Sequence, residues 1–281
     1  MKAYLQLVRA PAALTVLGDT VAGAAAAVKP LRGRRLLLPL SSAAFYWSGM
    51  ALNDWADREL DATERPERPI PSGRISPNRA LAVATGLTAA GLGIAAAAGR
   101  DAVRIALPLA AAVWAYDTVL KSTPAGPAGM AACRALDVLM GAGGARSALP
   151  AAAAVGGHTF GVTALSRGEV HGATPATVEA VLAGTALTAA AAAGGQANSV
   201  RHRIGALAGT ALYSATVGRA QLAARQDPSA ATVRRATMAG IHGMVPLQAA
   251  IAARRGSLLG ALAVVAALPV ARALSRKVSP T

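Results

Sequence analysis

Acidic side chains are scarce in this sequence. Only 13 of its 281 residues are Asp or Glu, against 28 Lys and Arg, and charged residues of both signs make up 15% of the chain. Soluble domains carry about 25% charged residues, so the composition argues against a water-soluble globular protein. With 54% hydrophobic residues and a mean hydropathy of +0.42, the chain is instead predicted to be an integral membrane protein.

Cysteine is almost absent as well. Cys133 is the one cysteine of the chain, so no internal disulfide can form and no redox compartment follows from it. The basic residues stand singly or in short groups between apolar runs, which indicates interfacial anchors and predicts no nucleic-acid partner. No protein partner can be inferred. Heavy use of Ala, Gly and Arg is typical of a GC-rich bacterial genome, so we expect a bacterial cytoplasmic membrane.

The apolar segments predict nine or ten transmembrane helices in a single domain over residues 1–281. Open sheets are excluded because lipid leaves their backbone groups unsatisfied. The first segment is long enough to cross a membrane, so we expect it to be a transmembrane helix and not a cleavable signal peptide. Arginines interrupt the pattern between 202 and 253, where one segment is a candidate interfacial helix. The segments lie near 10–28, 36–54, 78–98, 102–120, 127–146, 149–166, 176–195, 202–224, 229–253 and 256–275.

Six of the 13 acidic residues fall between positions 54 and 67, at the end of the second predicted span. On a helix of about 100° per residue, Asn53, Asp54, Asp57 and Asp61 lie within one arc. Carboxylates on one face repel each other and collect cations, and oxygen ligands favour Mg²⁺. The alternative is a solvated acidic helix end paired with nearby arginines.

A basic, proline-rich loop follows over residues 65–77. Three prolines within six residues cannot continue a helix, and Ser76 followed by Pro77 predicts the N-cap of the third span. The loop brings Arg68 and Arg74 back toward the acidic face, where guanidinium groups suit phosphate oxygens. The alternative is a solvated basic loop.

Charged pairs recur at or within later spans. Asp117 and Lys121 are four residues apart, so they form either an ion pair along a helix or a phosphate contact with an orienting carboxylate or metal ligand. Arg134 and Asp137 lie inside a span, where charges usually face a cavity or each other. They are therefore either a structural pair or part of a site.

The end of the sixth span carries Arg167 and Glu169. Four crossings separate it from the acidic cluster, which predicts that both lie on the same side of the membrane; the alternative is an ordinary interfacial loop. The four histidines have no spacing typical of a metal cluster, and we expect them in loops or at helix ends. Six of the nine aromatic residues gather at two helix ends, either as an interface belt or as a shield for a cationic intermediate: Phe45, Tyr46, Trp47, Trp55, Trp114 and Tyr116.

Together these motifs resemble the UbiA superfamily of intramembrane prenyltransferases. Asn53-Asp54-x-x-Asp57-x-x-x-Asp61 is similar to the family's first aspartate-rich motif, and the segment from Arg68 to Ser76 to its sequel. Tyr116-Asp117 with Lys121 and the N-terminal Arg9-Ala10-Pro11 add to the resemblance. It implies an all-α polytopic bundle of about nine transmembrane helices around a central cavity. It also implies Mg²⁺-dependent transfer of a prenyl group from a prenyl diphosphate to a small lipophilic acceptor.

The resemblance also implies roles for individual residues. Catalytic roles go to Asp57, Asp61, Lys121 and Glu169. Substrate contacts go to Asn53, Arg68, Arg74, Tyr116, Asp117, Arg134 and Arg167. Metal ligation goes to Asn53, Asp54, Asp57, Asp61 and Glu169.

One departure from the family pattern concerns the second aspartate-rich motif, Asp-x-x-x-Asp. The chain has Ser166-Arg167-Gly168-Glu169-Val170 at that place. We favour Glu169 as the substitute ligand over Asp117 and Asp137, and set Asp19 aside. The departure leaves two alternatives open: a terpene cyclase that uses the same ionising residues, and a non-catalytic membrane carrier that keeps the fold.

Overall fold

The computed structural model describes residues 1–278, and this part of the chain is helical without strands. Short 3₁₀ turns (η1 Ala10–Thr15, η2 Gly33–Leu37, η3 Leu120–Ser122, η4 Arg146–Ala148) connect some of the helices. The α-helices are α1 Lys2–Leu7, α2 Leu17–Ala26, α3 Leu38–Ala56, α4 Arg58–Glu64, α5 Pro77–Ala98, α6 Arg100–Thr118, α7 Gly126–Ala142, α8 Leu149–Ser166, α9 Pro175–Ala193, α10 Val200–Gln226, α11 Ala230–Arg254 and α12 Leu258–Val278.

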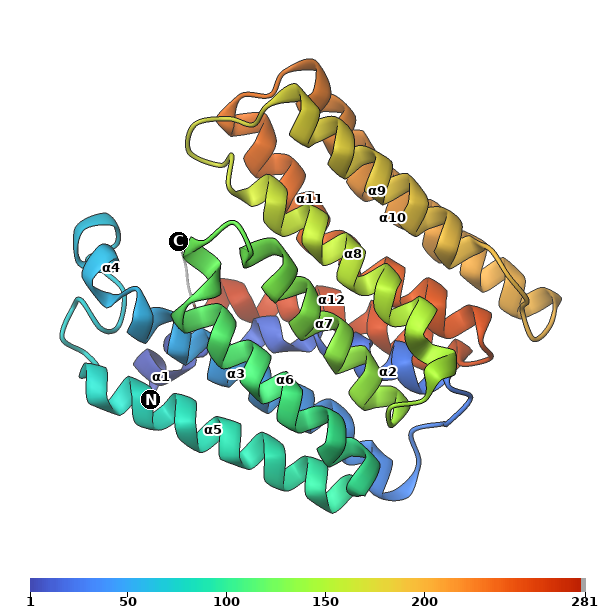
Figure 1. The fold of residues 1–281 in the computed structure, drawn as a ribbon, viewed down its shortest axis with the longest axis horizontal. Helices are drawn as coiled ribbons and strands as arrows, with labels where there is room; N and C mark the ends of the chain where they lie inside the picture. The colour runs from blue at the N-terminus through green and yellow to red at the C-terminus, as the bar shows by residue number, and fades with distance from the viewer. Residues whose placement is uncertain (279–281) are drawn as a thin grey trace.

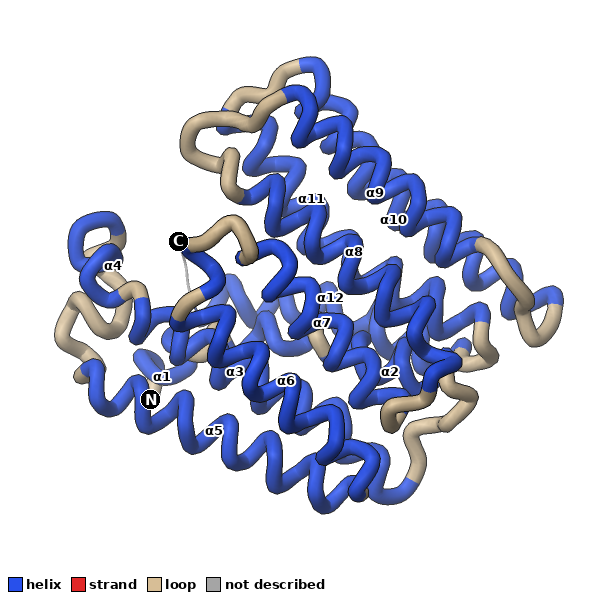
Figure 2. Tube along the Cα trace, in the orientation of Figure 1, coloured by secondary structure: helices blue, strands red, loops and turns tan. Residues whose placement is uncertain are grey.

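The long helices form a bundle in which neighbours in sequence pack side by side (Figures 1 and 2). α5 packs along α3, α7 lies between α6 and α8, and α10 packs along α11. α2 contacts α3, α7 and α11, so it connects helices from the first half of the chain with α11 near its end. Each predicted span contains one of the long helices, although the first is divided into η1 and α2.

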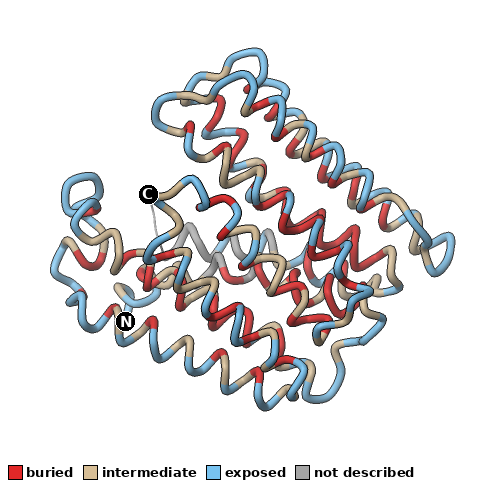
Figure 3. The backbone as a smooth tube through the Cα atoms, in the orientation of Figure 1, coloured by how far each residue is buried: buried red, intermediate tan, exposed pale blue. Residues whose placement is uncertain are grey.

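Burial distinguishes inner from outer helices (Figure 3). In the most apolar stretch of α11, 78% of the residues are buried inside the protein, against 22% in α5 and 28% in α9. An outer helix with apolar, exposed side chains is what a lipid environment requires. In the described part of the chain, four segments are long and apolar enough to cross a membrane by length and composition: α5, Arg146–Ser166, α9 and α11.

Small residues let the central helices approach closely, as expected from the Ala- and Gly-rich composition. A Cβ added to Gly141 of α7 would lie 2.3 Å from the backbone oxygen of Thr20 in α2. A Cβ on Gly23 of α2 would lie 1.8 Å from the oxygen of Val138 in α7. Glycine at these positions therefore fixes the distance between α2 and α7.

The loop from Arg65 to Ser76 is ordered as predicted. The hydroxyl of Ser76 accepts a hydrogen bond from the backbone N–H of Arg79 at 3.4 Å, and Pro77 opens α5, so the predicted N-cap is confirmed. The backbone N–H of Ile75 donates to the oxygen of Pro69 at 3.0 Å, which closes the loop on itself. Ile75 is buried and fastens the loop to the bundle.

Two histidines lie elsewhere than predicted, and one of them, His242, is in the middle of α11. His158 sits in the middle of α8 and is buried, so the expectation of a loop or helix end is wrong for it. Its Nδ1 is 2.9 Å from the Tyr213 hydroxyl and its Nε2 is 2.9 Å from the Gly240 oxygen. These contacts link α8 to α10 and α11, which is a structural role that spacing alone could not show.

Candidate active site

The acidic cluster lies where α3 ends and α4 begins. α3 ends at Ala56, and Asp57 adopts φ −89° and ψ 6° before α4 starts at Arg58. The backbone N–H of Asp57 still donates to the Asn53 oxygen at 2.9 Å, and that of Asp61 to the Asp57 oxygen at 2.8 Å. These hydrogen bonds carry the helical register across the break. The acidic residues therefore keep an almost helical spacing.

The cluster is divided into two groups by its cationic partners. The first group is Asn53 and Asp57, which both contact Lys121 of η3. The Lys121 Nζ is 2.7 Å from Asp57 Oδ1 and 3.1 Å from Asn53 Oδ1. The side chains of Asp57 and Lys121 are 27% and 18% exposed, so this group remains open to solvent or a ligand.

The second group is Asp54 and Asp61, which are buried. Arg68 Nη1 lies 2.5 Å from Asp61 Oδ2 and 3.4 Å from Asp54 Oδ1. Arg9 Nη2 lies 2.9 Å from Asp54 Oδ1, and Arg65 Nη1 lies 3.6 Å from Asp61 Oδ1. The N-terminal Arg9 and the loop residue Arg68 thus compensate carboxylates from which water is excluded.

Lys121 does not pair with Asp117, although the two are four residues apart. α6 ends at Thr118, so Lys121 lies in η3 and turns toward α3 instead of following the helix. The alternative of an ion pair along the helix is therefore not what forms. The Asp117 side chain faces the cavity, and it forms no ion pair with any residue that the structure describes.

Arg134 and Asp137 likewise find partners on other helices. Arg134 of α7 binds Asp19 of α2 through Nε (3.0 Å) and Nη2 (3.3 Å), while Asp137 Oδ2 accepts from the Ser42 hydroxyl at 2.5 Å. The alternative of an Arg134–Asp137 pair is therefore not what forms. Asp19, set aside from the sequence, is fully buried beside the site. A carboxylate within a predicted span was the signal that could have found it.

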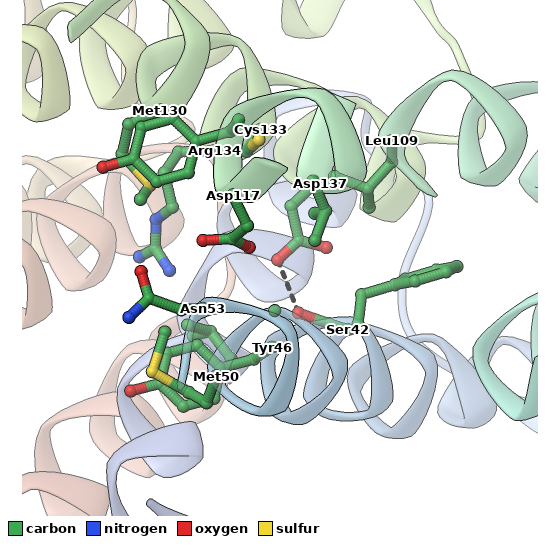
Figure 4. A pocket seen from close by; sticks show the side chains of 15 residues that line it. Ser42, Tyr46, Met50, Asn53, Leu109, Asp117, Met130, Cys133, Arg134 and Asp137 are labelled. Carbon is green, nitrogen blue, oxygen red and sulfur yellow. Dashed lines mark hydrogen bonds between the residues drawn. The ribbon is translucent and has the colours of Figure 1, made fainter. Parts of the chain in front are cut away.

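A cavity of about 190 Å³ begins beside Asn53 and extends between α3, α6 and α7 (Figure 4). Its walls are mostly apolar, and its polar side chains come from helices far apart in sequence. Four of the predicted site residues line it: Asn53, Tyr116, Asp117 and Arg134. The remaining lining residues are Val16, Ser42, Phe45, Tyr46, Gly49, Met50, Leu109, Val113, Met130, Cys133 and Asp137.

The clustered aromatic residues separate into two sets. Phe45, Tyr46 and Tyr116 line the cavity. The three tryptophans do not: Trp47 donates to the Ala10 oxygen, Trp114 donates to the Thr88 hydroxyl, and Arg58 lies over the ring of Trp55. Half of the set is thus placed to face a substrate.

Eight of the twelve predicted site residues lie outside the cavity lining, and three of these eight also take no part in the ion pairs of the acidic cluster. Arg74 donates to Gln6 Oε1 at 2.6 Å and fastens the loop to α1. Arg167 donates to the backbone oxygen of Thr123, which brings the end of α8 to the turn between α6 and α7. Glu169 is half-buried in the loop after α8. Their functional roles stay predictions.

The donor set at Asn53 and Asp57 suits a single hard cation. Their side-chain oxygens converge on the Lys121 ammonium nitrogen, which occupies the place of a cation in this geometry. Mg²⁺ is commonly held by one or two such oxygens together with water and phosphate. Within residues 1–278 there is no group of three Asp, Glu, His or Cys side chains that could hold a metal ion. The fit is therefore to one ion whose other ligands come from a substrate and water.

Comparison with known proteins agrees with this geometry. The UbiA prenyltransferase family matches residues 13–167. Digeranylgeranylglyceryl phosphate synthase of Methanopyrus kandleri is 41% identical over 129 residues, which are 44% of this chain and 46% of that protein. The same enzyme of Ignicoccus hospitalis is 39% identical over 124 residues, 44% of this chain and 40% of that protein. The matches thus span less than half the length of these curated relatives.

Two solved structures share the fold. An apo UbiA homologue from Aeropyrum pernix K1 has a TM-score of 0.68 at 18% identity, covering 85% of this chain and 96% of the other. A UbiA homologue from Archaeoglobus fulgidus bound to DMAPP and Mg²⁺ has a TM-score of 0.63 at 18% identity, covering 88% of this chain and 98% of the other. The predicted helical bundle is therefore confirmed.

Proposed function

The chain belongs to the UbiA prenyltransferase family, and we propose that it transfers a prenyl group from a prenyl diphosphate to a lipophilic acceptor inside a membrane, with Mg²⁺ as cofactor. The observation that carries the proposal is the convergence of Asp57 and Lys121 with Asn53, which itself lines the mostly apolar cavity. The family, four apolar helices and the composition place the protein in a membrane. Its assignment to a bacterial cytoplasmic membrane rests on composition alone.

In this proposal the diphosphate lies near Lys121 and the prenyl chain lies in the cavity. The Lys121 ammonium stabilises the negative charge that develops on the departing diphosphate. Asn53 and Asp57 would hold Mg²⁺, which when bound would neutralise charge on the diphosphate and favour its departure. Arg68 forms ion pairs with Asp61 and Asp54, so it can contact a diphosphate only if it gives up one of these carboxylates.

The cavity walls protect the allylic cation that remains. Phe45, Tyr46 and Tyr116 offer ring faces that attract a cation. The apolar lining keeps water from capturing the cation before the acceptor does. We keep Glu169 as the proposed ligand of a second metal ion, which Glu169→Gln would test through the Mg²⁺ dependence of activity.

Pyrophosphate release tests the proposal. Purified protein is given Mg²⁺, a lipophilic acceptor and dimethylallyl, geranyl, farnesyl or geranylgeranyl diphosphate. We expect release with at least one donor, its loss in EDTA, and a decrease of about 100-fold or more in Asp57→Asn, because a group that stabilises charge at the reacting centre is typically worth that much. Exposed Asp101→Asn is the matched control.

The proposal is wrong if the protein releases no pyrophosphate and binds no diphosphate with any donor of the panel. Product analysis without an acceptor separates the reaction from cyclisation. A cyclic hydrocarbon or alcohol would indicate a terpene cyclase, whereas a prenylated product that forms only with an acceptor supports transfer.

A further inference from the structure

The connection between α2 and α3 is strongly basic. Four of the seven residues from Lys29 to Arg35 are Lys or Arg, and no Asp or Glu lies between Asp19 and Asp54. The connection leads into α3, whose 19 residues span about 28 Å and end at the acidic cluster (Figure 1). The hydrocarbon core of a membrane is about 30 Å thick. The basic connection and the acidic cluster therefore lie at opposite membrane surfaces.

Three of these four cations have no partner within the protein. Lys29, Arg32 and Arg34 are exposed and form no ion pair within residues 1–278. Arg35 differs, because its Nη2 donates to the Gly141 oxygen at 2.7 Å and so caps the end of α7. Helix capping therefore explains Arg35 and leaves the other three cations without a structural role.

Arginines at the other end of the bundle are paired with acidic residues. Arg225 Nε lies 3.2 Å from Glu179 Oε1, and the arginines of the acidic cluster face buried carboxylates. Asp101 lies close to the basic connection, beside Gly143, but its carboxylate pairs with Arg104 at 3.5 Å. An excess of positive charge thus remains on the surface between α2 and α3, where it suits an anionic partner.

Exposed apolar side chains stand beside these cations. Val28, Leu36 and Leu40 are 62%, 59% and 56% exposed. Val28 also has φ 53°, a left-handed conformation that strains a β-branched residue and in which Gly is usual at the end of a helix. Its backbone N–H donates to the Ala25 oxygen at 2.9 Å, so the strained residue closes α2. A strained and exposed valine indicates a side chain whose partner lies outside the protein.

We propose that residues 28–40 form a docking segment for an anionic phospholipid. The three unpaired cations of the segment contact the lipid phosphate, as basic residues next to a transmembrane helix do at an anionic membrane surface. Val28, Leu36 and Leu40 contact its acyl chains. A free phosphate ion would leave these apolar side chains without a partner, so the segment fits a lipid better. Lipid binding at this surface is independent of the proposed reaction.

Lipid titration of the purified protein tests the proposal. Microscale thermophoresis in a neutral detergent compares phosphatidylglycerol with phosphatidylcholine of the same acyl chains. We expect phosphatidylglycerol to bind at least about tenfold more tightly, and about 0.5 M NaCl to reduce the difference because salt screens exposed charges. Equal affinity for the two lipids would overturn the inference. Displacement of phosphatidylglycerol by inorganic phosphate would also overturn it, because the site would then be one for a free anion.

Combined Lys29→Gln, Arg32→Gln and Arg34→Gln should weaken phosphatidylglycerol binding at least about tenfold, because each basic residue near an anionic lipid surface contributes about fivefold. The control makes the same change at three exposed arginines in the first turns of α5 and α11, at the other end of the bundle: Arg79, Arg234 and Arg235. The control should keep the lipid preference. An equal loss in both variants would show an effect of net charge alone and contradict the docking segment.

Val28→Gly separates backbone strain from lipid contact. Gly adopts φ 53° without strain, so the thermal unfolding midpoint in lipid-free detergent should rise. Affinity for phosphatidylglycerol should nevertheless fall at least about threefold, because an apolar contact is lost. Unchanged affinity would contradict the contact between Val28 and lipid. Should the triple variant not fold, the comparison of the two lipids on the unaltered protein decides.

Discussion

Arg68→Met is expected to lower the free energy of unfolding by about 3–5 kcal/mol, the usual effect of removing one partner of a buried ion pair. Asp61 is 1% exposed and its closest cation is Arg68 at 2.5 Å. After the substitution it keeps only Arg65, which is 3.6 Å away and half exposed. Asp54 retains Arg9. The loss therefore falls mainly on a buried carboxylate that no water can reach.

Lys121→Met is the matched comparison, because it removes a cation from the other group of the same cluster. Its partner Asp57 is 27% exposed and can be hydrated once the ammonium is gone. Partly exposed ion pairs contribute about 0–1 kcal/mol. The two variants should therefore differ by at least about 2 kcal/mol in stability, although both lose activity under the proposed function.

Unfolding in mixed detergent micelles measures the difference. The tryptophans of α3 and α6 lie near the cluster, so their fluorescence reports on this region. Similar small losses in both variants would refute the view that Asp61 depends on Arg68. Similar large losses would show that Asp57 is as inaccessible to water as Asp61, and the division into two groups would then be wrong.

Three further substitutions test the packing. Gly141→Ala should lower stability by about 1–3 kcal/mol or more, because its Cβ would lie 2.3 Å from the backbone oxygen of Thr20. Gly86→Ala, whose Cβ would have nothing within 4 Å, should raise stability by about 0.5–1 kcal/mol. Thermal unfolding compares the two variants, and unchanged stability of Gly141→Ala would contradict the close approach of α2 and α7. His158→Phe should cost about 1–3 kcal/mol, because the buried Tyr213 hydroxyl loses its imidazole partner; chemical denaturation measures this, and unchanged stability would argue against the contact.

The acidic motif illustrates how far sequence reasoning reached. Asn53, Asp57 and Lys121 were proposed for one site, and the structure brings them together. Asp54 and Asp61 were proposed as metal ligands beside them, but in the structure they are buried against Arg9 and Arg68. The helical spacing was correct. Which carboxylates remain accessible depends on what packs over them, and that information is not local.

The sequence by itself determined the membrane class, the helical bundle, the Ser76 N-cap and the clustering of oxygen ligands at the end of α3. Each of these follows from composition or from spacing within a few residues. Tertiary structure decided that Lys121 faces Asp57 and not Asp117, and that Asp19 binds Arg134 across 115 positions. A charge in an apolar interior takes the nearest compensating group in space, and helix packing, not sequence distance, decides which group that is.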